Sequence, residues 1–66
     1  MKIFVNEQPI EVAENCNINA LLTLLEKPLN GSAVAVNQRV ISRGSWSQFG
    51  LNEGDQISLF QAIAGG

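Results

Sequence analysis

The first residues of the chain alternate between apolar and polar positions. In MKIFVN, Ile3 and Val5 fall on one side of an extended backbone and Phe4 falls on the other. This period of two predicts a β-strand. The turn-forming residues NEQP follow, and the alternation resumes over residues 10–12. We therefore expect the two runs to pair as a β-hairpin.

The pattern changes to a helical period in NCNINALLTLLEKPLNG. The apolar residues at i, i+3, i+4 and i+7 are Ile18, Leu21, Leu22 and Leu25, and this spacing places them on one helix face. Asn17 suits the N-cap, because its side-chain amide can accept from the free N–H groups of the first turn. Pro28 should end the helix, since it lacks an N–H and disfavours helical backbone in the residue before it.

Two short apolar runs follow the helix, over residues 33–36 and 39–42. Asn37-Gln38 lies between them at the position of a tight hairpin turn, although it lacks the Gly of the strongest hairpin signal. The next segment, RGSWSQFG, predicts one helical turn or an irregular connector. Ser45 is its candidate cap and Gly50 its candidate stop.

A turn at residues 53–55 then precedes the final strand, which runs from Gln56 to Phe60 or Gln61. We interpret Gly54 and Asp55 as turn residues, because Gly accepts positive φ and Asp bonds nearby backbone. The element order predicts an α+β fold, a mixed sheet of about five strands packed on one main helix. The expected core joins two sets of side chains: Ile3, Val5, Ile57 and Leu59 from the sheet, and Leu21, Leu22 and Leu25 from the helix.

Composition narrows the classes of protein and site. The 66 residues suit one domain with an aliphatic core, given 45% hydrophobic residues, and the net charge is −2. Without a basic stripe the chain lacks the electrostatic footprint of a nucleic-acid binder. No apolar run approaches the ~20 residues that span a bilayer, so neither nucleic acid nor membrane is expected as a partner, and the partners should be proteins.

The single cysteine, Cys16, cannot close an internal disulfide, and no His/Cys cluster has metal-ligand spacing. We therefore expect no metal and no bound cofactor. An unpaired cysteine in a chain without a charged and apolar leader fits the reducing cytoplasm. Cys16 could accept sulfur or form a mixed disulfide, but the pattern favours an ordinary small residue beside a helix start.

Three aromatic side chains are candidates for packing or for partner contact. Trp46 is interpreted as a core or loop anchor in preference to an interface residue. If the first and last strands are neighbours, Phe4 and Phe60 both point away from the helix. Two readings then stay open: an exposed apolar surface for a partner, or rings that pack beneath loops.

The chain ends in FQAIAGG, and its last two residues, Gly65 and Gly66, carry the candidate chemistry. A backbone carboxylate is inert until it is joined to a good leaving group, such as the phosphate of ATP. Glycine has no Cβ atom that would clash with the walls of a narrow active site. The five residues 62–66 span at most ~17 Å when extended. We therefore divide the chain into a folded domain, residues 1–61, and a flexible tail, residues 62–66.

Four segments together carry a resemblance over the whole length: MKIFVNEQ, INALLTLLE, AVAVNQRVISRGSW and LNEGDQISLFQAIAGG. With them the chain resembles the ThiS family of sulfur carriers, which have the ubiquitin-like β-grasp fold and serve thiamine biosynthesis. The ending FQAIAGG is the most specific part.

The resemblance implies a function as a co-substrate, not as an enzyme. A ThiF-like adenylyltransferase would activate Gly66 with ATP, and sulfur from a donor such as a cysteine desulfurase would convert it to a thiocarboxylate. A ThiG-like thiazole synthase would then take the sulfur for the thiazole of thiamine. Gly65 would keep the tail slim for entry into an active site, and Phe4, Phe60, Ile63 and Ala64 would contact partners.

Two alternatives use the same Gly66 carboxylate. One is the small subunit of molybdopterin synthase, although chains that resemble that family end in PPVAGG and this chain ends in FQAIAGG. The other is a ubiquitin-like modifier that forms isopeptide bonds with lysines. An independent enzyme is not expected, because the chain has no histidine and no paired carboxylates that suggest a site.

Overall fold

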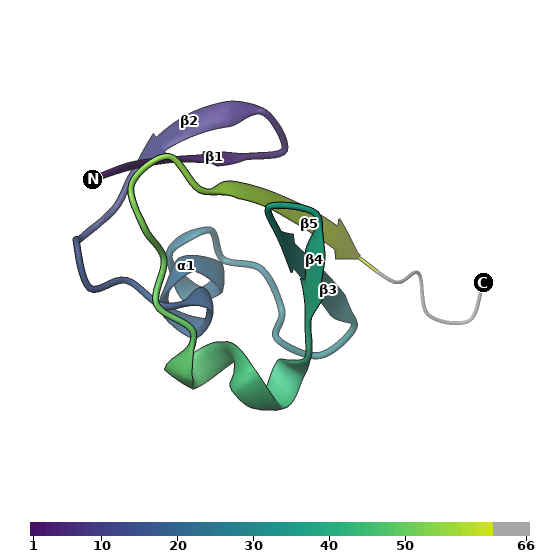
Figure 1. The fold of residues 1–66 in the computed structure, drawn as a ribbon. Coiled ribbons are helices and arrows are strands. Elements are labelled where there is room, and N and C mark those ends of the chain that lie inside the picture. The colour runs from purple at the N-terminus through teal and green to yellow at the C-terminus, as the bar shows by residue number, and fades with distance from the viewer. Residues whose placement is uncertain (62–66) are drawn as a thin grey trace.

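Five strands form one mixed sheet in the computed structural model, which describes residues 1–61. The elements in chain order are β1 (Lys2–Val5), β2 (Gln8–Glu11), α1 (Ile18–Leu24), β3 (Ser32–Val36), β4 (Arg39–Ile41), the 3₁₀ helix η1 (Arg43–Gln48) and β5 (Gln56–Gln61). The order across the sheet is β2-β1-β5-β3-β4 (Figure 1). β1 and β5 are parallel, and the other neighbours are antiparallel. The α+β prediction of one sheet with one main helix is confirmed.

Both hairpins turn through two residues with positive φ. Asn6 and Glu7 have φ of 48° and 72°, and Asn37 and Gln38 have φ of 51° and 72°. Two successive positive φ angles define a type I′ turn, whose twist matches that of the flanking strands. The predicted tight turn at residues 37–38 is confirmed, even though neither of its residues is glycine.

The first hairpin differs from the expectation at its second strand. β2 begins at Gln8 and ends at Glu11, whereas the alternation alone placed the strand over residues 10–12. The two-residue turn brings Gln8 directly opposite Val5, so Pro9 lies within the strand. Pro9 is tolerated there because β2 is at the edge of the sheet, where a missing N–H leaves no ladder bond unmade.

The start of α1 follows the sequence prediction. The Asn17 Oδ1 atom accepts from the Ala20 N–H at 2.7 Å, and Asn17 has the extended backbone of an N-cap. The Asn17 Nδ2 also donates to the Ser47 C=O at 3.0 Å, which ties the start of α1 to η1.

The end of α1 is a Schellman motif. The Lys27 N–H donates to the Leu22 C=O at 2.9 Å, and the Glu26 N–H donates to the Thr23 C=O at 3.1 Å. Glu26 takes the left-handed position with φ of 59°, where glycine is the usual residue. The helix thus ends before Pro28 and by its own hydrogen bonds, with Pro28 following the motif.

The core lies between the sheet and α1, as predicted. Its fully or nearly buried members include Ile3, Val5, Ile18, Leu21, Leu22, Val34, Val36, Ile41, Trp46, Leu51 and Ile57. Leu25 and Leu59 pack against it while partly buried. The predicted apolar faces of the helix and the sheet therefore meet.

The connector η1 packs beside α1. Ser45 is not its cap: Ser42 precedes the first turn, and the Ser42 side chain makes no capping hydrogen bond. Trp46 is 1% exposed, and its Nε1 donates to the Ile41 C=O at 2.9 Å. Its interpretation as a core anchor is confirmed. η1 ends at Gln48, and the predicted stop, Gly50, forms an isolated bridge with Asn17.

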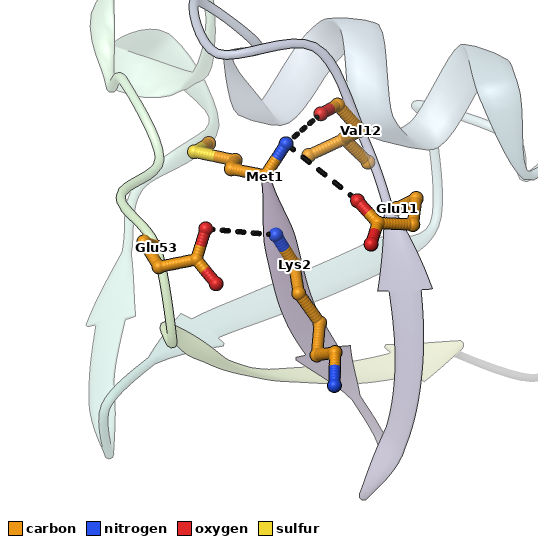
Figure 2. Close-up of polar contacts among 5 residues, drawn as sticks. All are labelled: Met1, Lys2, Glu11, Val12 and Glu53. Carbon is orange, nitrogen blue, oxygen red and sulfur yellow. Dashed lines mark hydrogen bonds and ion pairs between the residues drawn. The ribbon is translucent and has the colours of Figure 1, made fainter.

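Polar contacts hold the start of β1 to two neighbouring segments (Figure 2). The Met1 amino group donates to the Val12 C=O at 2.6 Å and lies 3.7 Å from a carboxylate oxygen of Glu11. The Lys2 N–H donates to Glu53 Oε1 at 3.0 Å. These contacts fix β1 against both the end of β2 and the turn before β5. Separately, none of the helices within residues 1–61 has the length and apolar content to cross a bilayer.

Candidate functional site

The described chain ends at Gln61, the last residue of β5. Four of the predicted site residues, Ile63, Ala64, Gly65 and Gly66, lie outside the described residues, as does the proposed tail of residues 62–66. The part of the site that the structure describes is therefore β5, from which the tail continues, and the residues around it.

β5 is paired along its whole length on the β3 side. The register runs from Val36 opposite Ile57 to Ser32 opposite Gln61. Asn37 extends this pairing by one residue, since its N–H donates to the Gln56 C=O at 2.7 Å and its Oδ1 accepts from the Gln56 N–H at 3.0 Å. The strand that leads to the tail thus has a fixed register.

Asp55 closes the turn that leads into β5 and is 8% exposed. Its Oδ2 accepts from the Asn52 N–H at 2.8 Å, and its Oδ1 accepts from Asn37 Nδ2 at 3.1 Å. Gly54 has φ of 84°. The predicted turn chemistry is confirmed, with the addition of the Asn37 contact, which links this turn to the β3–β4 hairpin.

On the β1 side, Asn6 has a role that the sequence pattern did not indicate. Its N–H donates to the Ile57 C=O at 2.9 Å, and its Oδ1 accepts from the Leu59 N–H at 3.0 Å. The side chain thereby acts as one more rung of the β1–β5 ladder after β1 has turned away. Asn6 was visible in the sequence only as a turn residue, since its partner Leu59 lies 53 positions along the chain.

Phe60 projects from the sheet face opposite α1 and is 60% exposed. It alternates with Ile57 and Leu59, which contribute to the core side. This exposure excludes packing beneath a loop for the Phe60 ring. Ala33, directly opposite Phe60 on β3, is also exposed, so the ring stands beside a small side chain.

Phe4 lies on the same face but is half-buried. Its partner in the register is Gln56, four residues before Phe60, which corresponds to roughly 13 Å along the strand. The structure therefore places the two rings on one face without bringing them together. We call this face, which bears Phe4, Ala33, Val40, Ser58 and Phe60, the outer face of the sheet.

A small pocket of about 70 Å³ lies on the helix side at the end of β5. Its lining includes Asn6, Leu59 and Gln61, together with Leu22 and Lys27 from the end of α1 and the loop after it. Lys27 brings a positive charge to the point where the described chain ends. The sequence did not indicate this residue, because its proximity to Gln61 depends on how the helix packs on the sheet.

Cys16 is 7% exposed and belongs to the core. Burial raises the pKa of the Cys16 thiol, because desolvation disfavours the thiolate. The thiolate is the nucleophilic form, so the interpretation of Cys16 as an ordinary packed residue is favoured over a sulfur acceptor.

Within residues 1–61 no three His, Cys, Asp or Glu side chains form a group able to hold a metal ion. The described surface therefore offers a strand of fixed register and an outer face with exposed apolar side chains.

Comparisons with known proteins cover the whole chain. The sequence model of the ThiS family matches residues 1–66. The sulfur carrier protein ThiS of Escherichia coli (strain K12) is 41% identical over 66 residues, which is 100% of each chain. The crystal structure of the thiamine biosynthesis protein ThiS from Geobacter metallireducens has a TM-score of 0.85 and 28% identity, with 100% of both chains covered. The solution structure of a thiamine biosynthesis protein from the same organism has a TM-score of 0.81 and 26% identity, covering 100% of this chain and 88% of the other.

Proposed function

The chain belongs to the ThiS family, and from this membership we propose that it carries sulfur for thiamine biosynthesis as a thiocarboxylate on Gly66. The family has the ubiquitin-like β-grasp fold that the sheet and helix display. A chain of this family is a sulfur carrier protein and not a catalyst. The observation that carries the proposal is the match to E. coli ThiS from the first residue to the last.

The chemistry begins with activation of the Gly66 carboxylate by an adenylyltransferase. A carboxylate oxygen attacks the α-phosphorus of ATP, and pyrophosphate leaves. The acyl-adenylate then has AMP as a good leaving group, so that sulfur at the oxidation level of sulfide can displace AMP and form the C–S bond. The product thiocarboxylate is a soft nucleophile, which a thiazole synthase can use as its source of sulfur. A cysteine desulfurase supplies sulfane sulfur as a persulfide, so a thiol must reduce this persulfide by two electrons, forming a disulfide and releasing sulfur at the level of sulfide.

The sequence of the tail and the position of β5 support a carrier whose C-terminus enters the active sites of partner enzymes. Gly65 and Gly66 lack Cβ atoms and suit passage into a narrow active site. β5 is hydrogen-bonded through both of its neighbours, β3 and the β1–Asn6 segment, so the base of the tail has a defined position. Residues 62–66 provide a reach of at most ~17 Å from that base.

We also propose that partner enzymes dock on the outer face of the sheet. Phe60 is the exposed apolar ring closest in sequence to the tail, and Val40 on β4 is 76% exposed. Exposed apolar side chains on one sheet face give a protein partner apolar area to bury. Phe4 adds a half-buried ring farther along the same face, and Ile63 and Ala64 would contact the enzyme that receives the tail.

The test is the intact mass of the chain after incubation with ATP, the cognate adenylyltransferase and a sulfur source. The expected result is replacement of one oxygen by sulfur, located at Gly66 by fragmentation. Adding one alanine after Gly66 should abolish the change, because the reactive carboxylate becomes an amide, while the far-UV circular dichroism stays the same.

Two outcomes would contradict the proposal. If the mass is unchanged while the partner enzymes are active on a known carrier, the carrier function fails. If adducts of the size of target proteins form instead, the chain acts as a conjugated modifier. A thiocarboxylate that supports molybdopterin formation but not thiazole formation would move the chain to the other pathway.

A further inference from the structure

β5 is a central strand along its first half and an edge strand along its second half. β1 pairs with β5 only at Gln56 and Ile57, whereas β3 follows β5 as far as Gln61. After Ile57, among residues 1–61, the Asn6 side chain alone continues the pairing, at Leu59. No other strand within residues 1–61 lies along this side of β5.

The hydrogen bonds identify the backbone groups that face this open side. The Ile57 C=O accepts from the Asn6 N–H, and the Leu59 N–H donates to Asn6 Oδ1. Alternate residues of a strand direct their backbone groups to the same side. The Leu59 C=O and the Gln61 N–H therefore face the open side too. Such groups form a template to which an extended segment can add as a new strand.

Side-chain features lie on both sides of this open edge. On the helix side is the 70 Å³ pocket, which Leu59, Phe60 and Gln61 line and to which Lys27 contributes. Phe60 alternates with Leu59 and Gln61 along β5, so its side chain, which is 60% exposed, projects toward the outer face. Successive side chains of an added strand point to opposite sides of a sheet. One side chain of such a strand would meet the pocket, and the next would meet the Phe60 ring.

We propose that an extended segment of the activating enzyme pairs with β5 along residues 59–61 and directs a carboxylate side chain toward Lys27. This inference rests on the proposed function, because it requires an enzyme that receives the tail. The location favours that enzyme as the occupant: residues 62–66 continue directly from Gln61, so a protein that takes up Gly66 passes beside the open edge. The Lys27 charge favours an acidic side chain in the added segment.

The first experiment removes one backbone donor. Gln61→Pro eliminates the N–H that faces the open side. Gln61→Ala keeps this N–H and also removes the glutamine side chain, so it is the matched control. We expect Gln61→Pro to raise the Kd for the activating enzyme at least tenfold and Gln61→Ala to change it less than threefold. The melting temperature should be the same for both, because that N–H is not part of the β3 pairing. Equal Kd values for the two variants would overturn the proposal.

Charge at the pocket is tested separately. Lys27→Glu should weaken binding at least fivefold, and Lys27→Arg, which keeps the charge, should bind as the wild type does. Equal binding by all three chains would show that no carboxylate faces Lys27 and would overturn that part of the proposal.

Amide hydrogen exchange on the wild-type chain tests the pairing without any substitution. The Gln61 N–H should exchange at least tenfold more slowly in the complex with the activating enzyme than in the free chain, while the Glu7 N–H in the β1–β2 turn should not change. An unprotected Gln61 in a complex that still forms the thiocarboxylate would reject the pairing and keep the function. A protected Gln61 without thiocarboxylate would reject the chemistry and keep the pairing.

Discussion

At the scale of single residues, the side chains that matter most for β5 are two asparagines in hairpin turns. Asn6 and Asn37 both have positive φ, which Asn tolerates better than most residues. Each also uses its side-chain oxygen to accept a β5 backbone N–H. One residue type thus forms the turn and extends the sheet ladder. A substitution by glycine would keep the first property and lose the second.

A second feature at the residue scale is the buried Cys16 thiol, which makes stability depend on pH. Burial raises the pKa of its thiol in the folded state, so the folded chain retains a proton that the unfolded chain loses as the pH rises. Linkage then requires that the stability from this group is complete below the ordinary pKa of a thiol, falls as the pH rises through it, and levels off above the raised pKa.

Urea unfolding between neutral pH and about pH 10.5 measures this dependence. Cys16→Ala is the matched control, because it retains a small apolar side chain and has no group to titrate. We expect the free energy of unfolding of the wild type to decline more steeply with alkaline pH than that of Cys16→Ala. Parallel curves for the two chains would show that the thiol is not desolvated.

At the scale of elements, the end of α1 contains a residue in an unfavourable backbone conformation. Glu26 occupies the left-handed position of the Schellman motif with φ of 59°. A residue with a Cβ is destabilised by about 1–2 kcal/mol in this backbone conformation. Glycine avoids that strain, but it lowers stability by about 0.4–1 kcal/mol because the unfolded chain has more conformational entropy to lose. We expect Glu26→Gly to raise the free energy of unfolding by about 0.5–1 kcal/mol, as measured by urea or thermal unfolding.

Glu26→Ala separates backbone strain from charge. Alanine keeps the Cβ and removes a negative charge from the helix C-terminus, where the macrodipole disfavours it. If strain dominates, Glu26→Ala should change stability by less than about 0.5 kcal/mol. If alanine stabilises as much as glycine does, the charge and not the backbone conformation is the cause.

At the scale of the whole molecule, the two faces of the sheet have different roles. α1 and η1 cover one face and bury the core, whereas the outer face exposes Phe60 and Val40. The parallel pairing of β1 with the first residues of β5 joins the first strand of the chain to the last described strand. β5 then continues past this pairing to Gln61, opposite Ser32 of β3, where the described chain ends.

Phe60→Asp tests the outer face as the docking surface. Because Phe60 is 60% exposed, the loss of stability should stay below about 1 kcal/mol. Binding to the activating enzyme should weaken at least tenfold, which is about 1.4 kcal/mol. Leu24→Asp is the control, since Leu24 is 57% exposed on the helix that covers the opposite face. Equal weakening by both variants, or unfolding of Phe60→Asp, would reject the outer face as the docking site.

Local patterns in the sequence determined the element types, the helix face, the N-cap at Asn17, the turn at Gly54 and the tight turn at Asn37-Gln38. Each of these depends on backbone preferences or on spacing within a few residues. The start of β2 was missed because Pro9, which disfavours a strand, made the whole of NEQP look like a turn. The cap of η1 was misplaced because Ser42 and Ser45 look equivalent in the sequence.

Tertiary structure alone decided which distant residues meet. The contact of Asn6 with Leu59 joins positions 53 apart, and the proximity of Lys27 to Gln61 depends on how α1 packs on the sheet. The open edge of β5 arises because β1 turns away after Val5. Periodicity reports which side of a strand is buried but carries no information about which strand lies beside it, so these features required the fold.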